Sequence, residues 1–391
     1  MPELLYLDHN ATTPIAPEVR AAMLPWLENE FGNPSSVYSL GRRSSAALTK
    51  AREQLAVLVG AQPAEIIFNS CGTEATNTAI LSALAIDPDK RHIITSSVEH
   101  SATIKLCEYL ATRGYEITWL PVDNDGLLDP DKLETAITAE TAVVSLLWAN
   151  NETGVIFPVE EIAAITTRKK VSLHLDAVQA AGKVPINLEE LGAQYVSLSA
   201  HKLYAPKGVG ALYVNRRVRY TPLLRGSQEE SKRGGTQNVA SIVAFGKAAE
   251  LAQEHLLASA ERIAKLRDRF EQIILSSVEG VRRNGTNEPR LPNTSNLTFT
   301  GIDAETALLL LDKEGLCCSA GSACSSGSIN PSHVLTAMGV TRDEARASLR
   351  FSLGRTTTNA DIDRALEIIP LIIAKLRSAQ PAGGAPVAIK S

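Results

Sequence analysis

The sequence predicts an α/β fold with a mostly parallel central sheet, flanking helices and a smaller α+β domain. Three observations support this. Over the first two thirds of the chain, short β-branched runs alternate with longer amphipathic stretches, which is the rhythm of β-α-β crossover units. The last third changes to longer helical patterns. The length of 391 residues also exceeds the roughly 250–300 residues at which one hydrophobic core stops growing, so we predict two domains.

The predicted strands are short runs rich in β-branched residues, at 66–68, 93–95, 117–120, 143–147, 173–175, 195–198 and 211–214. Amphipathic helices are predicted between them, for example at 75–84 and 159–169. In the last third we predict a charged helix over 260–275, a strand over 296–299 and a helix over 304–311 with Asp303 as its N-cap. The final helix begins at Thr358, and Asp361 completes a capping-box pattern.

Composition and charge exclude several classes of protein. Apolar residues make up 44% and charged residues 21% of the chain, which is close to the globular average and excludes disordered and fibrous classes. A net charge of −4 and an aromatic content of 5% give no reason to expect nucleic acid or a membrane as partner. The first residues lack the basic start and apolar run of a secretory leader, so we expect a cytoplasmic protein with reduced thiols.

Polar residues gather where the predicted strands end, which is where ligands of parallel sheets bind. Lys202 follows one strand and suits Schiff-base chemistry, although most loop lysines are simply exposed. Asp176 ends another strand and could hold a protonated ring nitrogen, with a helix N-cap as an even alternative. Gly72 and Thr73 could bind a phosphate and His100 could lie against a flat ring; a capped helix and a structural histidine are the competing interpretations.

Two further candidates lie in the last third of the chain. Cys324 is surrounded by small residues, so its thiol could swing and act as a nucleophile if a base or a lowered pKa supplies the thiolate. The nearby Cys317 and Cys318 resemble small buried hydrophobes. A zinc site competes, but the segment has no CxxC pair and only His333 is near. Arg350, in an apparent strand, is suited to grip a carboxylate through two parallel hydrogen bonds.

Together and in this order, the motifs resemble those of the cysteine desulfurases of the NifS/IscS type, within the class V aminotransferases. The resemblance covers nearly the whole chain, and its segments are 6–14, 32–36, 70–74, 98–100, 150–152, 176–179, 199–202, 234–236, 321–327 and 350–355. It implies a fold type I enzyme that uses pyridoxal 5'-phosphate (PLP). The large PLP-binding domain would span 15–257, and the small domain would comprise 1–14 and 258–391 and carry the Cys324 loop.

The resemblance also implies a role for each matching residue. Lys202 would bind the cofactor covalently and later move the α-proton, His100 would stack on the ring and help in proton transfer, and Asp176 would pair with the ring nitrogen. Gln179 and Asn151 would position the ring hydroxyl and the substrate. The phosphate would be held by Gly72, Thr73, Ser199 and His201, and by Thr236 of a second copy, so the resemblance implies a homodimer with shared active sites.

The implied substrate is L-cysteine, whose carboxylate would be bound by Arg350 with help from Asn33 and Asn151. Cys324 would attack the substrate sulfur, leaving L-alanine and an enzyme persulfide. The sulfur would then pass to an acceptor protein such as an Fe–S scaffold, or to other thio-cofactors, and no metal ion is expected. Selenocysteine lyase on the same scaffold is the alternative activity. A non-catalytic scaffold that holds a metal is a third interpretation, disfavoured by the presence of Lys202, Asp176 and His100.

Overall fold

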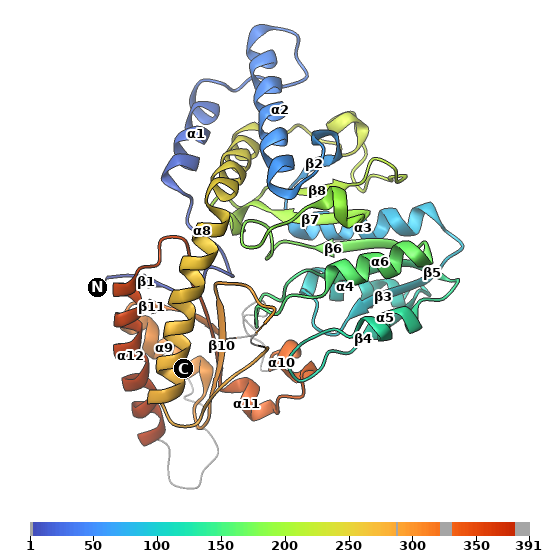
Figure 1. Cartoon of the computed structure of the whole chain (residues 1–391). Coiled ribbons are helices and arrows are strands. Elements are labelled where there is room, and N and C mark those ends of the chain that lie inside the picture. The colour runs from blue at the N-terminus through green and yellow to red at the C-terminus, as the bar shows by residue number, and fades with distance from the viewer. Residues whose placement is uncertain (1–2, 287, 321–330, 380–391) are drawn as a thin grey trace.

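A seven-stranded sheet forms the larger part of the computed structural model, which describes residues 3–286, 288–320 and 331–379 (Figure 1). The strands, in spatial order, are β2 (Ile66–Asn69), β8 (Gly210–Val214), β7 (Tyr195–Ser199), β6 (Ser172–Asp176), β5 (Thr141–Leu147), β3 (His92–Ser96) and β4 (Glu116–Leu120). Within this sheet β8 alone runs in the direction opposite to that of the other six strands. The predicted mostly parallel sheet is confirmed, and each of the seven predicted strands lies within an observed one.

Helices bury both faces of this sheet. Ile67, Ile93 and Val143 share one cluster with α3 (Gly72–Ile86) and α4 (Ser101–Ala111). Their neighbours in sequence, such as Ile94 and Val144, share another cluster with α6 (Val159–Lys169) and α8 (Val239–Ser277). Because successive strand residues face opposite sides, burial of both faces explains why these strands are continuous apolar runs.

A second, smaller core surrounds an antiparallel sheet in the order β12 (Ser319–Ala320), β13 (Ser348–Ser352), β10 (Thr294–Phe299) and β9 (Val281–Arg283). It is packed by α9 (Ala304–Lys313), α12 (Asn359–Ser378) and the second half of α8. The first strand, β1 (Leu5–Tyr6), pairs with β11 (Leu316–Cys317) and brings the N-terminus to this core. The caps predicted at Asp303 and at Thr358 with Asp361 are present.

The long helix α8 differs from its prediction. It begins at Val239, where Asn238 caps it, rather than near residue 260. Its first half packs on α1 and α2 and its second half on α12 and the small sheet, so it joins the two cores (Figure 1). The apolar stripe changes partners midway, and the sequence pattern alone shows only the charged second half clearly. The domain boundary at residue 257 stays a prediction, since α8 runs through it unbroken.

The remaining elements of the described chain are α1 (Pro17–Glu28), α2 (Ser39–Val59), α5 (Pro130–Ala136), α7 (Leu188–Leu191), α10 (His333–Ala337), α11 (Arg342–Arg346) and 3₁₀ turns at Pro63–Glu65, Ala200–Lys202 and Glu229–Ser231. Within the described ranges, no helix combines the length and the apolar composition that crossing a membrane requires.

Candidate active site

A cavity of about 370 Å³ lies at the carboxyl ends of β5, β6 and β7. Strand β13 of the antiparallel sheet contributes to its lining through Arg350. This is the position at which open parallel sheets bind ligands. Most of the residues predicted from the sequence line it together, namely Gly72, Thr73, His100, Asn151, Asp176, Gln179, Ser199, His201, Lys202 and Arg350. Asn10, Ala11 and Cys71 line the same cavity.

One corner of the cavity is the start of α3. Its N-cap is Cys71, whose Sγ accepts a hydrogen bond from the backbone N–H of Glu74 at 3.4 Å. The first N–H groups of a helix have no intrahelical partners, and they carry a partial positive charge. A Cβ on Gly72 would lie 2.9 Å from Cγ2 of Val178, so glycine is what allows the backbone this close approach. The corner is therefore suited to an anion such as a phosphate.

Ser199 and His201 close this corner from the opposite side. Ser199 is the buried last residue of β7, and the Nδ1 atom of His201 lies 3.2 Å from Oγ1 of Thr12. Burial, together with the nearby positive charge of Lys202, lowers the pKa of His201 from 6.5 to about 4. At neutral pH the ring is therefore uncharged and contributes hydrogen bonds rather than a positive charge.

The middle of the cavity holds Asp176 and His100. Asp176 ends β6, and its Oδ1 accepts from the backbone N–H of Val178 at 3.0 Å. Burial raises the pKa of Asp176, and the nearby His100 and Lys202 oppose that rise. A bound cation beside this carboxylate would restore its charged form. His100 is the N-cap of α4, and its Nδ1 accepts from the backbone N–H of Ala102 at 3.2 Å, which places an exchangeable ring proton on Nε2.

Lys202 lies in the 3₁₀ turn after β7 and reaches the chain near the N-terminus. Its Nζ donates to the backbone oxygens of Asn10 and Ala11, at 2.5 and 2.7 Å. These residues belong to segment 7–13, which we call the N-terminal strap. The strap runs from the small sheet across the cavity and also receives a hydrogen bond from Gln179, whose Nε2 lies 3.0 Å from the oxygen of Asn10. The opposite end of the Gln179 amide accepts from Nζ of Lys183 at 2.6 Å.

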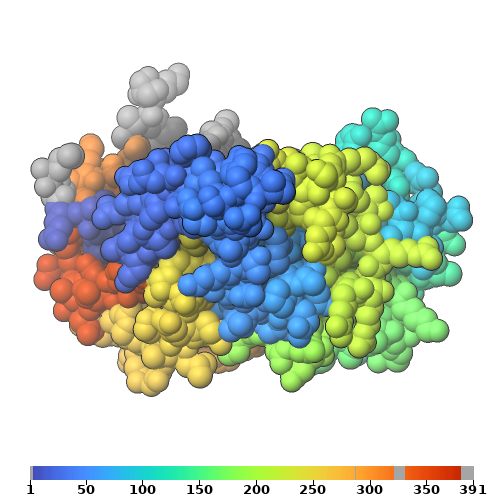
Figure 2. Space-filling view, turned by 90° about the horizontal axis from the view of Figure 1, so that it is seen from above, coloured from blue at the N-terminus to red at the C-terminus, as the bar shows by residue number. Residues whose placement is uncertain are grey.

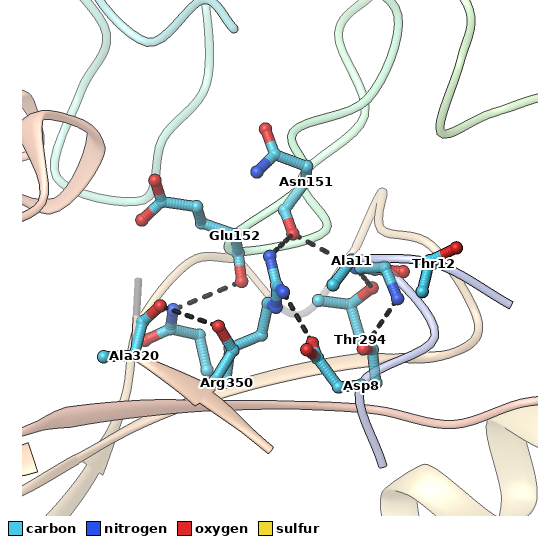
Figure 3. Close-up of polar contacts among 12 residues, drawn as sticks. Asp8, Ala11, Thr12, Asn151, Glu152, Thr294, Ala320 and Arg350 are labelled. Atoms are coloured by element: carbon cyan, nitrogen blue, oxygen red, sulfur yellow. Dashed lines mark hydrogen bonds and ion pairs between the residues drawn. The ribbon is translucent and has the colours of Figure 1, made fainter. Parts of the chain in front are cut away.

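Arg350 lies in the middle of β13 on the far wall of the cavity, and its side chain is only 3% exposed. Nη2 donates to Oδ1 of Asp8 at 2.7 Å, and Nη1 donates to the backbone oxygen of Asn151 at 3.0 Å (Figure 3). The side chain of Asn151 points away from the guanidinium in this view. The buried Nε of Arg350 has no hydrogen-bond partner among the described residues.

Three predicted site residues do not line this cavity within the described chain. Asn33 is exposed in the loop between α1 and α2, where its Oδ1 accepts from the backbone N–H of Ser35 at 2.9 Å. Thr236 lines a small surface depression beside β2 instead. Cys324 lies outside the described residues.

The other four cysteines are free thiols. Burial raises the pKa of Cys107 to about 12 and also raises the pKa values of Cys317 and Cys318, so these thiols are poor nucleophiles. Among the described residues, no group of three or more His, Cys, Asp and Glu side chains could hold a metal ion.

The sequence reasoning missed the polar partners of the site. Asp8 and Asn10 belong to a segment that carried the family resemblance, yet neither was assigned a role. The side-chain amide of Asn10 donates to the backbone oxygen of Asn151 and to Oγ1 of Thr294 in β10. It therefore connects the strap to the loop around Asn151 and to the small sheet. Glu152 is buried and accepts a hydrogen bond from Oγ of Ser332 at 2.5 Å. One sequence signal could have identified Asp8, Asn10 and Glu152. Each is a polar residue inside a segment of the family resemblance.

The chain is similar in sequence to known desulfurases along almost its whole length. The profile of the aminotransferase class-V family matches residues 5–365. The cysteine desulfurase NifS of Azotobacter vinelandii is 48% identical over 387 residues, which is 98% of this chain and 96% of the relative. A cysteine desulfurase of Trichormus variabilis is 51% identical over 379 residues, 97% of this chain and 95% of the relative.

A solved structure of a NifS-like protein matches with a TM-score of 0.90 at 36% identity, covering 96% of this chain and all of that one. The sheet order, the cavity and these matches agree. The chain belongs to the class V aminotransferase family and, within it, to the cysteine desulfurases of the NifS/IscS type.

Proposed function

We propose that this enzyme uses PLP to convert L-cysteine to L-alanine and collects the sulfur as a persulfide on Cys324. One observation carries the proposal: a single cavity brings together a lysine, a buried aspartate, a helix N-terminus and a buried arginine. These are the groups needed to hold an aldehyde, a ring nitrogen, a phosphate and a carboxylate.

The residues present fit the cofactor. The start of α3 offers backbone N–H groups to the phosphate, and Gly72 keeps that approach open. Asp176 would pair with the ring nitrogen, a bond that favours its charged form against the effect of burial. Gln179 and Asn151 lie where they could orient the ring hydroxyl. Bound PLP would supply an electron-withdrawing ring that weakens bonds to the substrate's α- and β-carbons.

Proton movement falls to Lys202 and His100. In the structure Nζ of Lys202 donates hydrogen bonds to two carbonyl oxygens of the strap. The same oxygens can accept from the free amine whenever Lys202 is not bonded to the cofactor. His100 has its Nδ1 occupied, so Nε2 is the ring atom that can give or take a proton.

Arg350 would bind the carboxylate of L-cysteine. Its orientation is fixed by Asp8 and by the oxygen of Asn151, and its Nε has no partner among the described residues. The fixed plane of the guanidinium suits a carboxylate. A solved structure whose protein, SspA, is in complex with cysteine matches this chain at 35% identity with a TM-score of 0.79, covering 90% of this chain and 99% of that one.

Chain connectivity supports Cys324 as the acceptor of sulfur. Ser319 pairs with Arg350 and Ala320 pairs with Leu349 in the antiparallel sheet. Cys324 is the fourth residue after Ala320, so an extended chain places it at most about 14 Å from a point beside Arg350. In the transfer, the Cys324 thiolate forms an S–S bond as the Cβ–S bond breaks. The electron pair stays with carbon, which takes a proton and becomes the methyl group of L-alanine.

We also propose a homodimer in which Thr236 of each copy completes the other's phosphate site. Thr236 lies outside its own cavity, beside β2. The face that carries α1 and α2 adjoins the segment around residues 215–237 (Figure 2), and Arg52 of α2 pairs there with Glu229. Phe31 and Val37, in the loop joining α1 to α2, are 78% and 85% exposed. Exposed apolar residues of this size are typical of a protein interface.

The persulfide would be delivered to an acceptor protein such as an Fe–S scaffold. We place the enzyme in the cytoplasm, because Cys324 must stay reduced between turnovers.

The test is mass spectrometry of the holoenzyme after treatment with L-cysteine. We expect one added sulfur on the peptide that carries Cys324, and none on that peptide in Cys324→Ser. The same variant should keep the visible absorption of the bound cofactor and release no sulfide with reductant, whereas Cys107→Ser should behave as the wild type. Wild-type sulfide release by Cys324→Ser would refute the assignment. Turnover of L-selenocysteine without turnover of L-cysteine would favour the lyase instead.

A further inference from the structure

The charge of Arg350 is already balanced before any substrate binds. Nη2 contacts the carboxylate of Asp8 at 2.7 Å, and both side chains are largely withdrawn from water, at 3% and 17% exposure. In such surroundings an ion pair is screened far less than at a surface. A carboxylate arriving at Arg350 therefore meets a pair with little net charge.

The backbone fixes Asp8 in this position. The strap runs parallel to β13, with the N–H of Ser352 donating to the oxygen of Leu7 and the N–H of His9 donating to the oxygen of Ser352. Asp8 therefore lies opposite Ser352. Side chains two residues apart in a strand share a face, so Asp8 faces Arg350 as well. The contact between Asp8 and Arg350 therefore follows from the register of the strap against β13, which places the two residues on the same face.

The strap is itself held in place on both sides of Asp8. The hydroxyl oxygen of Tyr6 lies 3.0 Å from the backbone oxygen of Asp8 and 2.9 Å from that of Thr12, so its one proton can be donated to either. The backbone N–H of Asn10 donates to Oγ of Ser352 at 2.9 Å. Figure 3 shows Asp8 and the oxygen of Asn151 approaching the guanidinium from different directions. The backbone of Asp8 is thus held in place beside Arg350 when a second carboxylate binds.

We propose that Asp8 is a positioning residue that orients Arg350 and weakens the binding of the carboxylate of both substrate and product. L-Cysteine and L-alanine carry the same carboxylate. An arginine with no counter-charge would hold both tightly, and product release would then limit turnover. With Asp8 present, the ligand carboxylate is attracted by Arg350 and repelled by Asp8. The carboxylate is thereby oriented without being bound strongly.

The inference rests on the proposed function, and the test compares two ligands that differ only in the carboxylate. L-Alanine and ethylamine are titrated calorimetrically into the holoenzyme, as wild type and as Asp8→Asn. Asparagine keeps an oxygen that can accept from Nη2 and removes only the charge. We expect the preference for L-alanine over ethylamine to rise at least about tenfold in the variant, because the negative charge that contacts the same guanidinium and repels the ligand carboxylate has gone. Inhibition of L-cysteine turnover by L-alanine should strengthen in parallel.

Asp363→Asn is the matched control, because Asp363 pairs with Arg269 on the exposed surface and its loss should leave the preference unchanged. Asp8→Glu keeps the charge and should stay closer to the wild type than Asp8→Asn. If Asp8→Asn does not fold, Asp8→Ser removes the same charge and is titrated in its place. A preference that stays the same or falls overturns the role of Asp8. A wild type that does not turn over L-cysteine refutes the proposed function instead.

Discussion

The two walls of the cavity are built in different ways. The wall proposed to hold the cofactor, which we call the cofactor wall, consists of residues that end or follow strands of the mostly parallel sheet, such as Asp176 and Ser199. Each is fixed mainly by its own strand and turn. The carboxylate wall centres on Arg350, in the middle of a strand of the other sheet, and its partner Asp8 lies 342 residues away in sequence.

Because of this difference, we expect the cofactor wall to govern the chemical step and the carboxylate wall to govern ligand affinity. The cofactor wall can be complete once its sheet has formed, because its chemistry sits at strand ends. The carboxylate wall exists only when the N-terminal strap, β13 and the loop around Asn151 have come together. Variants of the first wall should therefore abolish cofactor binding or chemistry, whereas variants of the second should change ligand affinity and stability.

The largest effect is expected from the cofactor wall, with Lys202→Ala. The variant should lose the visible absorption of lysine-bound cofactor, and turnover of L-cysteine should fall by at least about 10³-fold, since it loses both the attachment point and a proton carrier. Absorption spectra and sulfide release measure the two effects. Lys207→Ala, an exposed lysine in the same loop, is the control and should resemble the wild type. Retention of the colour by Lys202→Ala would show that another group holds the cofactor.

The matching change on the other wall is Arg350→Gln. Glutamine has no positive charge for the ligand carboxylate, and removing one partner of a buried charge pair costs about 2–5 kcal/mol of binding free energy, so we expect KM for L-cysteine to rise roughly 10²-fold. Cofactor absorption should persist, because no cofactor-wall group is altered. A KM that stays at the wild-type value, or loss of the cofactor, would contradict the division between the walls.

The same division explains what could be predicted from the sequence. Lys202, Asp176 and Gly72 follow strands that their own apolar runs reveal, so local pattern was enough to place them at one sheet edge. Arg350 was recognised, but its pairing with Asp8 depends on a strand register between the two ends of the chain. No local pattern carries such a register. The full length of α8 was missed for a similar reason, since its two halves are stabilised by different cores.

A smaller effect is expected from Gly72→Ala. The added Cβ would lie 2.9 Å from Cγ2 of Val178, and such crowding typically costs about 1–3 kcal/mol. Because α3 itself tolerates alanine well, we expect this free energy to be lost from binding of the phosphate at the start of the helix. We expect the dissociation constant of the cofactor to rise about tenfold. Equilibrium dialysis measures it, and an unchanged constant would show that the phosphate does not approach this backbone.

The last effect is expected from Glu152→Gln, beside the carboxylate wall, and it concerns stability alone. Burial raises the pKa of Glu152 from 4.5 to about 7, although its hydrogen bond from Ser332 opposes this. Between these pH values the folded protein holds a proton that the unfolded chain has released, so stability falls as pH rises through this window. The loss of stability is at most about 3–4 kcal/mol for a shift of this size.

Glutamine keeps an oxygen for Ser332 and does not titrate, so Glu152→Gln should lose less stability than the wild type between about pH 5 and about pH 7. Thermal unfolding midpoints measured across this range provide the test. Glu161→Gln, on the exposed surface of α6, is the control and should follow the wild-type curve. Parallel curves for Glu152→Gln and the wild type would mean that Glu152 is already charged in the fold. Two negatively charged carboxylates, Asp8 and Glu152, would then lie near Arg350 rather than one.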